Sequence, residues 1–102
     1  MEFTLNGIGK DLLVNDRGVF ITEKGTSVYI PYRSIEAIVL KEASALSSGY
    51  ILFRTPGSFI GSHAAKSTEM EVAMDRQGVL FKKNNYELAV TIRDAIVEKL
   101  SL

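Results

Sequence analysis

The chain has 102 residues, no cysteine and 46% hydrophobic residues. A chain of this size buries one hydrophobic core, so we expect a single domain over residues 1–102. Without thiols it forms no disulfide bond and offers no thiolate metal ligand, and the cytoplasm is the expected compartment. No run approaches the ~18 apolar residues of a membrane-spanning helix, and charges interrupt the first twenty residues, so we expect neither an anchor nor an export signal.

Charge is balanced and dispersed along the chain. Twelve basic and twelve acidic side chains cancel, and the only adjacent basic pair is Lys82–Lys83. Nucleic-acid-binding proteins usually concentrate positive charge so that several phosphates are neutralised together, so we expect no nucleic-acid partner. The lysine pair could contact an anionic membrane at ~1 kcal/mol per lysine, although a solvated turn beside a helix start is the expected role.

The first turn signal lies at Gly7–Lys10. Its glycines resemble those of a phosphate-binding loop. The longer glycine spacing, the following Ser or Thr and the helix that such a loop requires are all missing. A bend or bulge is therefore expected here, with no bound phosphate.

A β-hairpin is the clearest local structure in the first third of the chain. The strand-like runs Asp11–Asn15 and Val19–Thr22 flank the turn Asp16–Gly18, where glycine tolerates a positive φ. A second turn at Glu23–Thr26 leads to a third predicted strand at Ser27–Ile30, where Val and Tyr favour a pleated surface. The pattern predicts consecutive antiparallel strands.

The middle of the chain predicts two more strands and a long loop. Pro31 ends the third strand, because proline has no amide to donate to a ladder. A fourth strand is expected near Ile35–Leu40, where apolar residues occupy both parities, so its buried face stays open. Glu42–Ser48 predicts a connection, although its alanines also allow a helical turn, and the apolar run Tyr50–Phe53 predicts a central strand. Thr55–Ser67, with its glycines and small polar residues, predicts an irregular loop.

Alternating hydrophobicity then predicts a strand with one wet face and one buried face. Met70, Val72 and Met74 alternate with more polar residues, so we expect these three side chains in the core and not at a soft metal site. The turn Asp75–Gly78 follows. Val79–Phe81 predicts the last strand, which completes a hairpin.

The hydrophobic period changes in the terminal segment Asn85–Leu100. Its apolar positions recur every four residues: Leu88, Ile92, Ile96 and Leu100. Charged residues fill the other side, so the segment predicts an amphipathic helix with one face that must be covered. Asn84 or Asn85 is expected to supply the N-cap through its side-chain oxygen.

The order of these elements resembles that of the bacterial pleckstrin-homology-like families. The resemblance covers nearly the whole chain: strand-like runs precede one helix, with Ile30–Ile35 leading into the fourth run, Gly49–Phe53 as the fifth and Val79–Phe81 just before the helix. It implies a mainly β fold, a partly open barrel of about seven antiparallel strands capped by one C-terminal α-helix. In such a fold Phe81 closes the last strand, and the helix plugs the splayed corner of the sheets through Leu88, Ile92 and Ile96. These families bind lipids, peptides or copies of themselves, and most bacterial members are of unknown function.

The chain departs from the lipid-binding pattern of pleckstrin-homology domains. Those that bind inositol phosphates place several Lys and Arg residues around the first hairpin loop. The Asp16–Gly18 turn offers only Arg17 beside a carboxylate, with Lys10 and Lys24 as the nearest further cations. Because one paired arginine supplies little positive field, specific binding of inositol phosphates is not expected.

The Thr55–Ser67 loop carries the residues expected to touch a partner or a lipid. They are Phe59, Ile60, His63 and Lys66. Phe59 and Ile60 could enter a partner or a membrane, but folding back over an open barrel end is favoured because small domains bury their apolar groups. His63 is the only histidine, and without partner ligands we expect it to be solvated.

The sequence therefore predicts a non-enzymatic binding or assembly module with no catalytic, cofactor or metal site. Protein–protein interaction or self-association through an exposed sheet edge is the leading hypothesis, because strand addition requires only unpaired backbone groups. The alternative is weak peripheral membrane or lipid binding through the Thr55–Ser67 loop.

Overall fold

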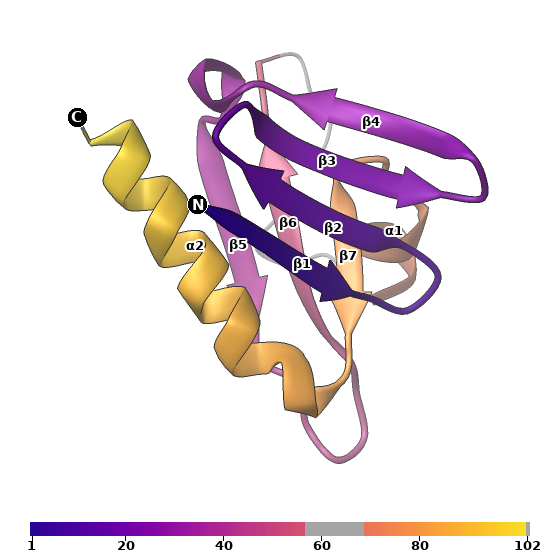
Figure 1. Ribbon diagram of the computed structural model, residues 1–102. Helices are drawn as coiled ribbons and strands as arrows, with labels where there is room; N and C mark the ends of the chain where they lie inside the picture. Colours follow the sequence, from indigo (N-terminus) through magenta and orange to yellow (C-terminus); the bar gives the residue numbers. More distant parts are fainter. Residues whose placement is uncertain (57–68, 102) are drawn as a thin grey trace.

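The computed structural model describes residues 1–56 and 69–101, arranged as two antiparallel sheets and a C-terminal helix (Figure 1). The four-stranded sheet contains β1 (Glu2–Asn6), β2 (Asp11–Asn15), β3 (Gly18–Glu23) and β4 (Thr26–Ile30), paired in chain order. The three-stranded sheet contains β5 (Ala37–Lys41), β6 (Gly49–Arg54) and β7 (Gly78–Phe81). The remaining elements are the 3-10 turns η1 (Tyr32–Ser34) and η3 (Lys83–Asn85) and the helices α1 (Glu69–Met74) and α2 (Tyr86–Leu100).

The two sheets face each other around one core, and α2 covers one side of the sandwich. The strands of the two sheets cross, and α2 lies along the side formed by β1 and β5 (Figure 1). Ala89, Ile92 and Ile96 on the inner face of α2 are buried in the core, with Phe81 at the end of β7. The arrangement confirms the predicted mainly β fold of seven antiparallel strands capped by a C-terminal helix, and it is consistent with a pleckstrin-homology-like sandwich.

A tight turn ties the first hairpin to the other sheet. The turn between β1 and β2 closes through Gly7 N–H donating to the Lys10 carbonyl at 2.9 Å, and Ile8 N–H donates to the Leu80 carbonyl of β7 at 2.8 Å. A Cβ on Gly7 would lie 2.4 Å from Val79 Cγ1, so only glycine allows this approach. The predicted bend at Gly7–Lys10 is therefore confirmed as a turn that links the two sheets.

The three-stranded sheet is covered on both faces. Ile51 and Phe53 of β6 pack into the main core, while Tyr50 and Leu52 pack outward against Val72 of α1. The prediction that β6 is a central strand is therefore confirmed. The same double covering explains why β5 is apolar at both parities: Ile38 and Leu40 pack against the main core, whereas Val39 packs against the outer cluster.

The segment around Val72 is a helix, and the prediction of a strand there is wrong. Val72 is buried against the outer face of the three-stranded sheet, but the Met74 side chain is 79% exposed, so its predicted place in the core is also wrong. Alternation over six residues fits one short helix that buries a single side chain as well as it fits a strand. The seventh strand is β1, whose Phe3 and Leu5 face the core.

The predicted N-cap of the last helix also differs from the structure. Asn85 occupies the N-cap position of α2 but makes no capping hydrogen bond with its side chain. Its Nδ2 instead donates to the Asn6 carbonyl at 3.1 Å, which ties the start of α2 to the end of β1. The preceding turn η3 leads directly into α2 and takes the place of a side-chain cap.

Candidate binding edge and neighbouring pocket

The backbone of β4 presents hydrogen-bonding groups to the outside of the sandwich. Lys24 and Gly25, with φ angles of 46° and 83°, form a two-residue turn between Glu23 and Thr26. In such a hairpin the closing pair is hydrogen-bonded, and hydrogen-bonded pairs then alternate along the strands. Thr26, Val28 and Ile30 therefore direct their backbone groups to β3. Ser27 and Tyr29 direct theirs away from the sheet.

The β4 edge is exposed, whereas the other three sheet edges have neighbours. Thr26, Ser27 and Tyr29 are all exposed, and within the described ranges no hydrogen bond involves the backbone N–H or C=O of Ser27 or Tyr29 beyond the strand ladder. In contrast, α2 packs against β1 and β5, and the turn before β2 donates to β7. In the part of the chain that the structure describes, β4 is thus the open edge.

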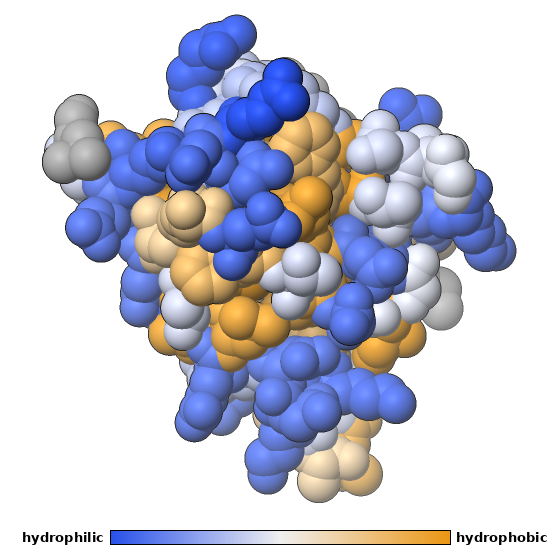
Figure 2. All heavy atoms as spheres, viewed as in Figure 1, coloured by the Kyte–Doolittle hydropathy of each residue, from blue (hydrophilic) through white to orange (hydrophobic). Residues whose placement is uncertain are grey.

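Aromatic side chains lie beside this edge on the outer face of the four-stranded sheet. Leu13, Phe20 and Tyr29 occupy neighbouring positions on adjacent strands. The rings of Phe20 and Tyr29 stack with centroids 4.9 Å apart, and Tyr29 Oη donates to the Arg17 carbonyl at 3.0 Å. Figure 2 shows hydrophobic residues gathered in the middle of this face between hydrophilic ones. The edge is therefore flanked by a fixed apolar surface.

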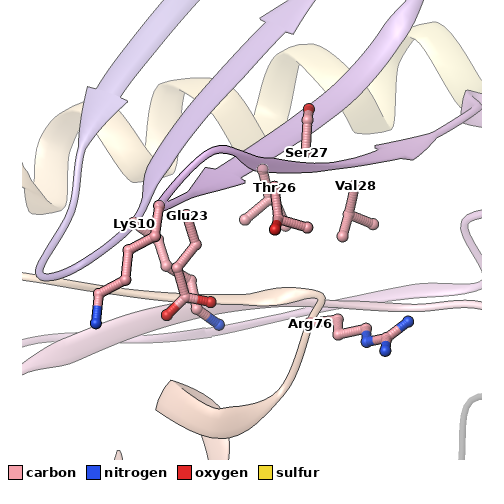
Figure 3. A pocket seen from close by; sticks show the side chains of 8 residues that line it. Lys10, Glu23, Thr26, Ser27, Val28 and Arg76 are labelled. Atoms are coloured by element: carbon pink, nitrogen blue, oxygen red, sulfur yellow. The ribbon is translucent and has the colours of Figure 1, made fainter.

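A pocket of about 420 Å³ lies on the inner side of the β3–β4 hairpin (Figure 3). It is lined by Lys10, Ile21, Glu23, Lys24, Thr26, Ser27, Val28 and Arg76. In Figure 3, Thr26 and Val28 point toward the turn that carries Arg76, and Ser27 points the opposite way, as alternation along β4 requires. The pocket thus lies between the hairpin and the turn that precedes β7.

The pocket lining carries more positive than negative charge. Lys10 is 7% exposed, and its ammonium donates to the carbonyls of Asp75 and Gly78, so it connects the β1–β2 turn to the turn before β7. Lys24 and Arg76 add two exposed cations, and Glu23 is the one carboxylate of the lining. No ion pair joins these charges in the described ranges. The Lys10 ammonium is already bonded to two carbonyls, and the lining contains no paired nucleophile and base.

Tyr32 contacts the C-terminal end of α2. Its hydroxyl donates to the Asn15 carbonyl, and Lys99 Nζ lies 5.2 Å from the centre of its ring. Burial raises the pKa of the Tyr32 phenol, and the negative charge of Asp16 raises it further. Asp16 is also 3.5 Å from the amino group of Met1 and 4.0 Å from Lys99 Nζ. These contacts hold the last turn of α2 against the β2–β3 turn, which is a structural role.

The four residues predicted to touch a partner lie outside the described residues. Phe59, Ile60, His63 and Lys66 all belong to 57–68, so the structure neither brings them together nor separates them. The exposed edge that the self-association hypothesis requires is found at β4, which the sequence did not single out. The available signal was the run Thr26–Ile30, an uncharged strand that contains no proline.

Residues 1–56 and 69–101 thus form a small β-sandwich that is capped by a helix and has one open strand edge, at β4. None of the described helices is long and apolar enough to cross a bilayer. Over the same residues, no three side chains of His, Asp or Glu gather where they could hold a metal ion. No protein-family model matches the chain, and searches of curated proteins and solved structures found no match.

Proposed function

We propose that the chain is a non-enzymatic assembly module of the pleckstrin-homology-like class that associates with itself by strand pairing along β4. The observation that supports this proposal is the outward backbone of Ser27 and Tyr29 on an exposed edge. Most natural edge strands are protected by lysine, proline or a bulge. β4 has no such residue between Thr26 and Ile30, and it pairs with β3 without a bulge.

Antiparallel pairing of two copies about Val28 satisfies all the outward groups. Ser27 of one copy then lies opposite Tyr29 of the second copy, and each such pair exchanges two hydrogen bonds. A shift in one direction pairs Ser27 with itself and leaves Tyr29 opposite the turn residue Gly25. A shift in the other direction places Ser27 opposite Pro31, which has no amide. The centred register is therefore the one we propose.

The side chains near β4 are compatible with this register. Val28 meets its own counterpart on the inner side, and the partly buried Val28 already packs against the core. Tyr29, stacked on Phe20, lies next to Ser27 of the second copy on the outer face. β4 itself carries no charge, so pairing places no like charges directly opposite each other. Two four-stranded sheets would join into one continuous sheet.

Light scattering coupled to size-exclusion chromatography, over a range of concentrations, tests the proposal with two variants. Ser27→Pro removes an outward amide but no bond to β3, so we expect a folded monomer. Ser27→Ala, the matched control, keeps every backbone group and should dimerise like the original chain. Circular dichroism verifies that both variants fold. A strictly monomeric original chain at high concentration overturns the proposal.

Amide hydrogen exchange identifies the interface without a substitution. In the monomer, the amides of Ser27 and Tyr29 should exchange rapidly, whereas those of Val28 and Ile30 are protected by β3. In the dimer, protection of Ser27 and Tyr29 should rise with protein concentration. A dimer in which these two amides remain unprotected uses another surface and contradicts the role of β4.

Weak lipid binding through Thr55–Ser67 stays a prediction. Phe59, Ile60 and Lys66, on which it depends, lie outside the described residues. Co-sedimentation of the Phe59→Asp variant with liposomes remains its direct test.

A further inference from the structure

Residues 42–48 form the loop that joins β5 to β6, and this loop carries a leucine whose side chain is almost entirely in contact with solvent. Leu46 is 98% exposed, the highest value among the exposed large hydrophobic side chains of the described residues. The loop lies at one end of the molecule, beside the start of α2, and Figure 2 shows hydrophobic atoms at this lower tip. A fully hydrated leucine on an ordered loop gives the fold no burial energy.

Hydrogen bonds within the loop hold Leu46 in this position. Ser44 Oγ accepts from the amides of Leu46 and Ser47 at 3.3 and 3.1 Å. The Ser44 amide donates to the Ser47 carbonyl at 2.8 Å, and Lys41 Nζ donates to the Ser48 carbonyl at 3.1 Å. Much of the polar backbone of the tip is thus already paired, which lowers the cost of moving it out of water.

Two exposed lysines lie beside the tip. Lys82 and Lys83 line a shallow hollow of about 310 Å³ together with residues 44–48, and no carboxylate takes part in this lining. Neither lysine has an ion-pair partner in the described part of the chain. The nearest acidic residue in the loop sequence is Glu42, which is exposed at the start of the loop.

We propose that the 42–48 loop and the Lys82–Lys83 pair form a contact site for an anionic phospholipid surface. The apolar side chain at the tip enters the boundary between head groups and acyl chains, and the two ammonium groups face lipid phosphates. A protruding side chain fits a bilayer without a matching cavity, whereas a protein partner would need a pocket shaped for Leu46. The site goes beyond self-association through β4 and uses different residues.

Vesicle co-sedimentation at low ionic strength tests this site. The probes are vesicles of phosphatidylcholine alone and vesicles with an equal amount of phosphatidylserine. We expect binding to the anionic vesicles only, and a loss of roughly fivefold for each lysine changed in Lys82→Gln and Lys83→Gln, which corresponds to ~1 kcal/mol per charge. Arg17→Gln with Arg33→Gln, two exposed cations in other turns, is the charge-matched control and should bind normally.

Fluorescence reports whether the tip enters the lipid. The chain has no tryptophan, so Leu46→Trp introduces a unique fluorophore, and its emission should shift to the blue with anionic vesicles. Met74→Trp, at another highly exposed apolar position, is the matched control and should not shift. An unshifted Leu46→Trp spectrum, binding that survives Leu46→Asp, or equal losses in the lysine and arginine variants each overturn the proposal. Ser27→Pro should leave vesicle binding in place, which separates this result from a failure of self-association.

Discussion

Lys10 is a buried charged residue whose hydrogen bonds contribute to the fold. It is the only charged side chain in the described ranges that is buried, and two carbonyls near β7 take the place of an acidic partner. A charged donor to a carbonyl is stronger than a neutral one, and the carbonyls in turn lose their partner if the ammonium is removed. Lys10 therefore links the two sheets at the side opposite α2.

Replacing Lys10 by methionine keeps the length of the side chain and removes the ammonium. Two carbonyls, those of Asp75 and Gly78, lose their donor, so we expect Lys10→Met to lower the free energy of unfolding by about 1–3 kcal/mol. Urea denaturation measures this change. The exposed Lys24→Met is the control and should change stability by less than ~0.5 kcal/mol. Similar losses in both variants would mean that the bonds of Lys10 do not stabilise the fold.

At the level of elements, the sequence predicted most of the strands and the C-terminal helix that covers the sandwich. Each of these elements is marked by a local period in the hydrophobic residues. β2, β3, β4, β6 and β7 lie close to their expected positions, and α2 begins one residue after the expected start. The face of β5 stayed open in the sequence because both faces of its sheet are buried. That burial results from α1, whose contact with β6 and β7 no local pattern encodes.

The candidate site was less predictable than the fold. A strand edge is open when no other element packs against it. Where α2 packs depends on the tertiary structure and cannot be inferred from the sequence of β4. Ser27 and Tyr29 are ordinary strand residues, and only the two-residue turn at Lys24–Gly25 fixes which way their backbone groups point. Leu46 was likewise hidden in a segment that appeared to be a simple connection.

The helical nature of α1 makes a prediction that a strand does not. In the helix, Val72 is buried and Met74 is exposed, although the two have the same parity. Val72→Ala should lower the free energy of unfolding by about 1.5 kcal/mol or more, from lost burial and the cavity left behind. Met74→Ala should change it by less than ~0.5 kcal/mol. Comparable losses for both variants in urea denaturation would restore the strand prediction.

For the whole molecule, the proposed dimer links stability to concentration. A partner that binds only the folded chain stabilises it by mass action, so the thermal midpoint rises with concentration. We expect this rise for the original chain and for Ser27→Ala, but not for Ser27→Pro. Scanning calorimetry at several concentrations measures the slope, which remains informative even if the proline lowers the midpoint itself. If the thermal midpoint rose equally with concentration in all three proteins, β4 would not be the site of assembly.

Neighbouring residues of β4 have different roles, because alternate residues direct their backbone groups to opposite sides of the strand. Thr26, Val28 and Ile30 give their backbone groups to β3, and Val28 and Ile30 also give their side chains to the interior, whereas Ser27 and Tyr29 keep both kinds of group on the outside. Substitutions at the odd-numbered positions could therefore change which molecules bind along β4. The even-numbered positions would still maintain the same fold.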